Sequence, residues 1–146
     1  MEVAGGENSL GAFRIAKSEK RIEKMADGTD REYRYVLGPV LIPNRVDLQK
    51  DWVSPAEIED ACHLFMQSLM VSDGHNRVVK SSEATFVENY VMPVDVRVGN
   101  MDIPCGTWMA AARVYSPELI RKVDSGEYRG FSVEGTADHV ENKLSA

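Results

Sequence analysis

The sequence predicts a single α+β domain, mainly antiparallel β, in which a barrel-like sheet is flanked by two helices. Strand-like stretches outnumber helical ones, and the two kinds do not alternate as they would in a parallel α/β fold. Hydrophobic residues make up 43% and charged residues 27% of the 146 residues. These proportions are typical of a soluble domain with its own core.

The first part of the chain predicts a flexible arm followed by extended segments. Residues 1–11 are rich in glycine and polar residues, which favours a flexible N-terminal arm. Residues 12–18 and 33–42 look extended, and the charged segment between them contains Asp27-Gly28, a common hairpin turn. Gly38 and Pro39 predict a bulge, a bend or an edge strand in the second stretch.

Two helices have clear start signals. The first, over residues 54–70, begins with Ser54 as N-cap, and Glu57 completes a capping box. An apolar stripe at helical spacing follows, made of Ile58, Ala61, Cys62, Phe65, Met66 and Leu69. A shorter helix begins in the same way at Ser116 and ends before Gly126.

The remaining stretches predict further strands and turns. Strands are expected at residues 77–80, 85–92, 107–115 and 128–136, with turns at residues 93–95, 99–100 and 104–106. Small alanines alternate with other side chains in residues 107–115, which predicts that another element packs closely against this strand. We therefore expect one domain over residues 12–136 and a polar C-terminal tail over residues 137–146.

Composition excludes several classes of protein. The formal net charge is −6 and the pI is about 5.1, whereas a protein that binds nucleic acid usually has a basic face. No apolar run approaches the ~20 residues of a membrane span, and the first residues do not read as a secretory signal. Cys62 and Cys105 form no metal motif, so we expect reduced thiols, with no cofactor and no metal.

Three histidines and one serine are the residues best placed for chemistry. His63 lies beside the apolar stripe of the first helix, His75 follows at a junction of helix and strand, and His139 lies in the polar tail. Ser132 sits in a strand-like run between two glycines, which let a substrate approach and free main-chain N–H groups for an oxyanion. Each also has a structural explanation, as a solvated histidine or a plain strand serine.

A serine becomes a nucleophile only beside a base that a third group orients. Carboxylates available for that third role are Glu83, Glu88, Glu134 and Asp138. Glu88 stands out because the surrounding run, FVENYVM, is otherwise strand-like with little reason to hold a charge, although an outward-facing strand residue explains it equally well. The histidine spacings match no zinc motif, and the glycines form no phosphate-binding loop.

Four ordered blocks resemble the phage serine proteases of the XkdF type. The blocks are VLGPVLIPNRVDLQKDWVSPAEIEDACHLFM, DGHNR, FVENYVMP and PCGTWMAAARVYSPELIRKVDSGEYRGFSVEG, and together they cover roughly residues 33–135. This family is grouped with the capsid-maturation (prohead) proteases of tailed phages. The resemblance implies a herpesvirus assemblin-like fold, an antiparallel β-barrel surrounded by helices.

The resemblance also implies roles for particular residues. Ser132 in GFS matches the family nucleophile, and His75 best matches the general base, with His63 as its rival. Glu88 in FVENYV matches an acidic position and is our choice for the orienting group. His139 and Asp138 are the other candidates for that third position. Arginines assist the distant viral relatives, and Arg113 and Arg129 are the candidates here.

The function implied by the resemblance is that of a serine endopeptidase of capsid maturation. Its substrates and partners would be the phage scaffold protein, segments of the major capsid protein and the protease itself, inside the immature head in the host cytoplasm. A homodimer is expected by analogy with the herpesvirus enzymes. The alternative is a catalytically silent relative that acts in the phage head or at the head–tail connection.

Two departures from the family pattern accompany this resemblance. Lys50 stands where the family usually has a glycine in its DLQGD block. The sequence also ends at Ala146, where family members often continue into a long charged extension. The expectation is therefore a stand-alone protease whose scaffolding role belongs to another protein.

Overall fold

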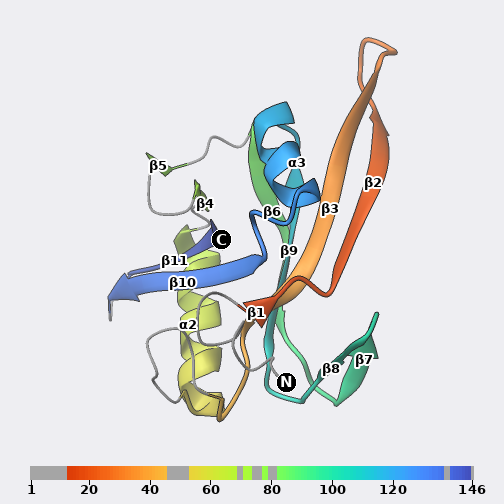
Figure 1. The fold of residues 1–146 in the computed structure, drawn as a ribbon. Coiled ribbons are helices and arrows are strands. Elements are labelled where there is room, and N and C mark those ends of the chain that lie inside the picture. The colour runs from red at the N-terminus through yellow and green to blue at the C-terminus, as the bar shows by residue number, and fades with distance from the viewer. Residues whose placement is uncertain are drawn as a thin grey trace.

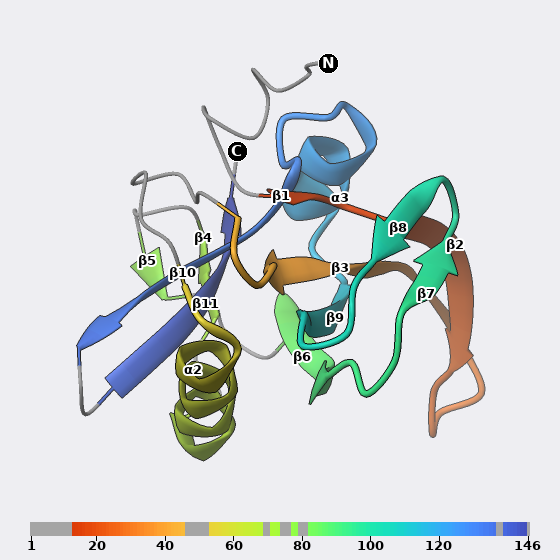
Figure 2. The same cartoon turned by 90° about the horizontal axis from the view of Figure 1, so that it is seen from below.

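The computed structural model describes residues 13–45, 53–68, 71–73, 77–78, 82–136 and 139–145. Within them the chain forms a four-stranded sheet, a five-stranded sheet, a two-stranded hairpin and two helices (Figures 1 and 2). All strand pairs but one are antiparallel in this described part. The predicted class, α+β and mainly antiparallel, is confirmed.

The four-stranded sheet forms the centre of the fold. Its order is β2 (Lys17–Lys24), β3 (Asp30–Leu41), β9 (Trp108–Val114) and β6 (Ala84–Val91). β2 and β3 form the long hairpin that extends from the body in Figure 1, and its turn contains the predicted Asp27-Gly28, with Gly28 at a φ of 88°. The pairing of β3 with β9 shifts register between Pro39 and Leu41, where a bulge, a bend or an edge strand is expected; β3 has the irregularity but is an interior strand of this sheet.

The charged segment before the turn is itself a strand. The sequence pattern predicts that residues 19–24 connect two strands. In the structure they form most of β2, at the edge of the sheet. An edge strand tolerates charge because one side of it faces solvent. Cross-strand ion pairs to β3 also stabilise it, among them Lys20 with Glu32 (3.3 Å) and Arg31 with Glu23 (2.9 Å).

Strand β9 is buried on both faces. Trp108, Ala110 and Ala112 belong to a first core cluster that also contains residues of both helices and of β10. Met109 and Ala111, the intervening residues, belong to a second cluster on the other face, with Tyr35 and Ile103 among its members. The expectation that other elements pack closely on the alanines is confirmed.

The two faces of the central sheet are covered differently. Helix α2 (Pro55–Ser68), helix α3 (Pro117–Asp124) and β10 contribute to the first cluster. The hairpin of β7 (Val96–Val98) and β8 (Met101–Ile103) covers part of the second, and Figure 2 shows it on the opposite side of the sheet from α2. The predicted turn at residues 99–100 joins β7 and β8, strands too short for sequence patterning to reveal.

Both helices begin as the sequence predicts. The main-chain N–H of Ser54 donates to Glu57 Oε1 (3.1 Å) and the N–H of Glu57 donates to Ser54 Oγ (3.3 Å), so the capping box is formed. Ser116 caps α3, where its Oγ accepts from the N–H of Leu119. No described helix is long and apolar enough to cross a membrane.

The second sheet draws its strands from distant parts of the chain. Its order is β1 (Phe13–Arg14), β10 (Gly130–Thr136), β11 (His139–Ser145), β4 (Val71–Asp73) and β5 (Arg77–Val78). β11 pairs parallel with β4 and packs against α2, as both views show. Residues 139–145, expected within a polar tail, are therefore a strand, because each has a partner in β10.

The barrel-like closure expected from the sequence is not what the structure shows. In the described residues the central sheet ends at β2 and β6, and neither strand pairs with the second sheet. The sheets instead make contact through side chains, as where the ring of Phe131 in β10 meets that of Phe86 in β6. The predicted barrel is corrected to two open sheets and a separate hairpin.

A buried polar contact ties β9, β6 and α2 together. The indole N–H of the fully buried Trp108 donates to Asn89 Oδ1 (2.5 Å), and the amide of Asn89 donates to the carbonyl oxygen (3.3 Å) and Sγ (3.2 Å) of Cys62. An indole N–H in the core needs an acceptor, because an unpaired buried donor is costly.

We predict that Asn89→Ala lowers the free energy of unfolding by about 2 kcal/mol, because the Trp108 N–H loses its acceptor. Urea denaturation followed by tryptophan fluorescence measures the change. Asn100→Ala, at an exposed turn position, is the control and should shift stability by less than about 0.5 kcal/mol. Equal effects of the two variants would contradict a special role for Asn89.

Candidate active site

Strand β10, which carries Ser132, is held firmly at its start. Phe131 is fully buried, and its ring centre lies 5.4 Å from that of Phe86. Tyr128, just before the strand, is also buried. Ser132 follows within the same strand, where its main chain pairs with Lys143 of β11.

The strand register places the flanks of His75 in the same sheet as Ser132. Ser132 pairs with Lys143 of β11, which pairs in turn with Ser72 of β4. Ser72 is therefore two strands away from Ser132, roughly 10 Å at ordinary strand spacing, and three residues before His75. β4 and β5 pair with each other on either side of residues 74–76. Residues 74–76, which include His75, lie outside the described residues.

His63, the rival base, lies on helix α2. Its side chain is exposed and flanks the buried stripe of Ile58, Cys62 and Phe65, as expected. α2 packs against β11, the neighbour of the strand that carries Ser132 (Figures 1 and 2). The structure thus brings the helix of His63 close to the β10–β11 pair but leaves the imidazole in solvent.

The remaining candidates near Ser132 in sequence are spread along the β10–β11 hairpin. His139 pairs with Thr136 at the far end of the hairpin. That position is four residues along the strand from Ser132, roughly 13 Å of main chain. Glu134 lies within β10, and Asp138 lies outside the described residues.

Glu88 lies on the opposite face of the central sheet from Phe131. Its carboxylate accepts a hydrogen bond from the hydroxyl of Tyr35, which belongs to the second cluster. Burial, and then this hydrogen bond, raise the pKa of Tyr35 well above its ordinary value, so the phenol stays protonated. This position does not favour Glu88 as the group that orients a base for Ser132. Glu83 lies before β6, where its carbonyl accepts from the N–H of Tyr115 (2.8 Å).

A β-bulge fixes which face Glu88 occupies. The pairing of β6 with β9 shifts register between Phe86 and Glu88, so that Val87 is an extra residue. Phe86 and Asn89 consequently both contact first-cluster residues although three positions separate them. Glu88 is left on the second face, beside Tyr35.

The two candidate arginines differ in their surroundings. Arg113 donates to Glu23 Oε1 (2.7 Å), and its guanidinium lies 4.7 Å from the ring centre of Tyr33. Those contacts stabilise the second face of the central sheet. Arg129 is exposed directly before β10, and its carbonyl accepts from the N–H of Ile15 (2.6 Å). Of the two, Arg129 is the one beside the strand of Ser132.

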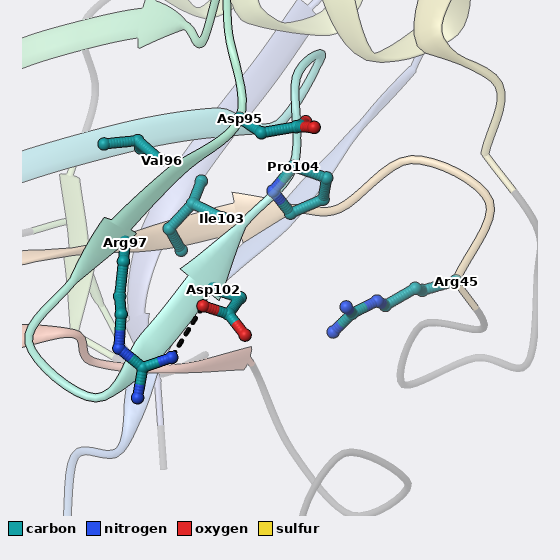
Figure 3. Close-up of a pocket in the computed structure, with 7 residues that line it drawn as sticks. All are labelled: Arg45, Asp95, Val96, Arg97, Asp102, Ile103 and Pro104. Atoms are coloured by element: carbon teal, nitrogen blue, oxygen red, sulfur yellow. Dashed lines mark hydrogen bonds and ion pairs between the residues drawn. The ribbon is translucent and has the colours of Figure 1, made fainter.

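One surface pocket lies beside the β7–β8 hairpin, and another lies beside β1 and the end of α3. The larger, about 450 Å³, is lined by residues of the β7–β8 hairpin and by Arg45. Arg97 donates to Asp102 there (2.7 Å), and Arg45 extends toward that pair from the loop after β3 (Figure 3). The smaller, about 380 Å³, lies between β1 and the end of α3 and includes Arg129. Of the two pockets, the smaller is the one whose lining includes Arg129, directly before β10.

Within the described part of the chain, no group of three His, Cys, Asp or Glu side chains is placed to hold a metal ion. The two cysteines are free thiols in different surroundings, Cys62 buried and Cys105 exposed. Burial raises the pKa of the Cys62 thiol to about 11.

Comparison with known proteins identifies the family. The chain matches the family described as "Putative phage serine protease XkdF" over residues 20–141, and it belongs to that family. The matched range includes Ser132 and all three histidines.

Two curated relatives from Bacillus subtilis (strain 168) are similar to this chain. The phage-like element PBSX protein XkdF is 30% identical over 125 residues, which cover 86% of this chain and 45% of that protein. The uncharacterized protein YqbD is 31% identical over 137 residues, which cover 90% of this chain and 42% of that protein. The chain therefore spans less than half the length of either relative. No solved structure matches it.

The strand pairing that places Ser132 in one sheet with the strands on either side of His75 was not predicted from the sequence. It depends on the parallel pairing of β11 with β4, two strands that are far apart in the chain. A weak local signal exists, because Val140 and Leu144 fall on one face in the alternation of an extended strand, with charged and polar residues between them. Nothing in that alternation names the partner strand.

The surroundings of the two thiols give a prediction for chemical labelling. With a pKa of about 11, only about one Cys62 in a thousand is a thiolate at pH 8, and burial hides it further. We expect a thiol-reactive disulfide reagent to modify one cysteine quickly in the folded chain and the second only in denaturant. Cys105→Ser should remove the fast phase. A fast phase that persists in this variant would mean that the buried face of α2 opens readily.

Proposed function

We propose that this chain is the protease domain of a phage serine endopeptidase, with Ser132 as nucleophile and His75 as general base. Membership of a family described as phage serine proteases supports the class of reaction. The choice of residues depends on the strand pairing. Ser132 pairs with Lys143, which pairs with Ser72, so the strands on either side of His75 belong to the same sheet as the serine.

The proposed reaction is acyl transfer to Ser132. Its Oγ forms a bond to the peptide carbonyl carbon while its proton passes to His75, and main-chain N–H groups hold the oxyanion. His75 then gives the proton to the leaving amine as the C–N bond breaks. Water, deprotonated by His75, releases the new carboxyl end and restores the serine hydroxyl.

Glu88 is not part of this proposal. Its hydrogen bond with Tyr35 on the second face of the sheet gives it a structural role, in which it holds a buried tyrosine. The third group is therefore to be sought nearer β10, where His139 and Asp138 are the sequence candidates. His63 is kept as the rival base because α2 packs against β11.

We further propose that the substrates are the scaffold protein, segments of the major capsid protein and the protease itself, cleaved inside the immature head in the host cytoplasm. An assemblin-like ancestry and a homodimer belong to the same proposal. The mixture of antiparallel strands and two helices supports that ancestry, and the open sheets are a departure from it. The net charge of −6 suits a protein enclosed before DNA enters.

We predict that Ser132→Ala abolishes both labelling by a fluorophosphonate probe and cleavage of co-expressed capsid and scaffold proteins. Mass spectrometry of the assembled particles measures the cleavage. Ser82→Ala, at an exposed position before β6, should behave as the unaltered chain. Uncleaved capsid protein with every variant, the unaltered chain included, would instead indicate the catalytically silent structural relative.

The two histidines are separated by the same assay. His75→Ala should lower the rate of labelling by about a hundred- to ten-thousandfold, because the serine loses its base. His63→Ala should stay within about twofold of the unaltered chain, since its side chain is exposed on α2. The reverse pattern would transfer the role of base to His63.

A further inference from the structure

The pocket beside the start of β10 has a distinct chemical character. It has a volume of about 380 Å³, and its lining includes Arg14, Ile15, Ser18, Val123, Tyr128 and Arg129. Val123 and Tyr128 are buried, whereas both arginines are exposed. The pocket thus combines an apolar wall with two guanidinium groups.

The charge of this pocket contrasts with that of the whole chain. Both charged residues in its described lining are arginines, although the chain carries a net charge of −6. The nearby Asp124 receives two hydrogen bonds from Arg34 (2.9 Å each). Lys122 lies beside the pocket, with its Nζ 5.3 Å from the ring centre of Tyr128, and the exposed Glu127 stands between the lining residues Gly126 and Tyr128.

The main chain fixes the pocket in place relative to Ser132. Arg14 pairs with Gly130 of β10, and the N–H of Ile15 donates to the carbonyl of Arg129 (2.6 Å). β1 passes close to the central sheet because position 38 is glycine, and a Cβ there would lie 3.1 Å from Ile15 Cα. Arg129 precedes Ser132 by three residues, roughly 10 Å along an extended strand.

We propose that this pocket binds an acidic side chain of the peptide substrate, with Arg129 as the specificity-determining residue. The planar guanidinium matches a carboxylate, which it binds through two parallel hydrogen bonds. A distance of roughly 10 Å corresponds to about three residues of extended peptide, so the acidic residue lies near but not at the bond to be cleaved. This inference rests on the proposed function for the position of that bond.

An acidic peptide is favoured over a nucleic acid as the occupant. A polyanion would meet the field of the whole chain, whose net charge of −6 repels it. A single carboxylate on a peptide meets the guanidinium of Arg129, and the apolar wall of Val123 and Tyr128 receives the neighbouring side chains.

The test is a binding measurement on the full chain with Ser132→Ala, so that turnover plays no part. Two blocked hexapeptides, identical except for Glu or Gln at one position, are titrated to millimolar concentration against the ¹⁵N-labelled chain. We expect the Glu peptide to shift the amide signals of residues 14–18 and 123–129. Arg129→Gln should weaken its binding about tenfold or more, whereas Arg121→Gln, an exposed arginine of α3 outside the pocket, should not.

Several results would overturn the inference. These are no shift at these residues, equal shifts from the Glu and Gln peptides, and equal losses in the two arginine variants. The same shifts from inorganic phosphate at equal concentration would make the pocket a general anion site and contradict the assignment to a peptide. Failure of Ser132 to react with the fluorophosphonate probe would count against the proposed function, and it leaves this binding result unaffected.

Discussion

The fold depends on a central strand, β9, that is fully buried on both faces over residues 108–112. In β9 the residues Ala110, Ala111 and Ala112 are all fully buried, between two strands of the same sheet and between two layers of other elements. A larger side chain at any of them would displace a neighbour, because protein interiors are packed as closely as organic crystals. Trp108 is the large residue of the strand, and its indole N–H needs Asn89. The close approach of α2 and β10 to the sheet follows from this constraint.

The two faces of the central sheet are covered by different elements, and the strand of the candidate nucleophile lies on one of them. The second face is closed by the short β7–β8 hairpin and by arginines stacked on tyrosines, such as Arg21 over Tyr35 at 3.9 Å. The first face is closed by both helices and by the strand that carries Ser132. The strand that carries Ser132 therefore packs through Phe131 on the face of the central sheet that is opposite the β7–β8 hairpin.

Local signals predicted much of this fold. The capping box at Ser54, the cap at Ser116 and the turn at Asp27-Gly28 each depend on residues within a few positions of one another, and each forms as expected. The charged strand β2 was missed because its stability comes from cross-strand ion pairs rather than from apolar alternation. The barrel was predicted from the number of strands, but closure depends on which strands pair, and no local pattern determines that.

The candidate site was harder to predict for the same reason. The neighbouring residues in the sequence and the resemblance to a family are enough to indicate Ser132 and His75. Whether the two lie near each other depends on the pairing of β11 with β4. A charge in an otherwise apolar strand distinguishes Glu88 in the sequence, but the bulge at Val87 decides which face of the sheet Glu88 occupies. One inserted residue thus changes the neighbours of every later side chain in the strand, and sequence periodicity alone does not reveal it.

The parallel pairing of β11 with β4 also bears on the order in which the domain folds. The β2–β3 hairpin and α2 contain mostly local contacts, so they form early, while a sheet that joins residues 71–73 to residues 142–144 must first close a long loop. During synthesis on the ribosome, β10 lacks its neighbour β11 until nearly all of these residues have emerged. In the proposed protease, the strand of the nucleophile would thus gain its neighbour β11 late, which would delay reactivity until this part of the sheet has formed.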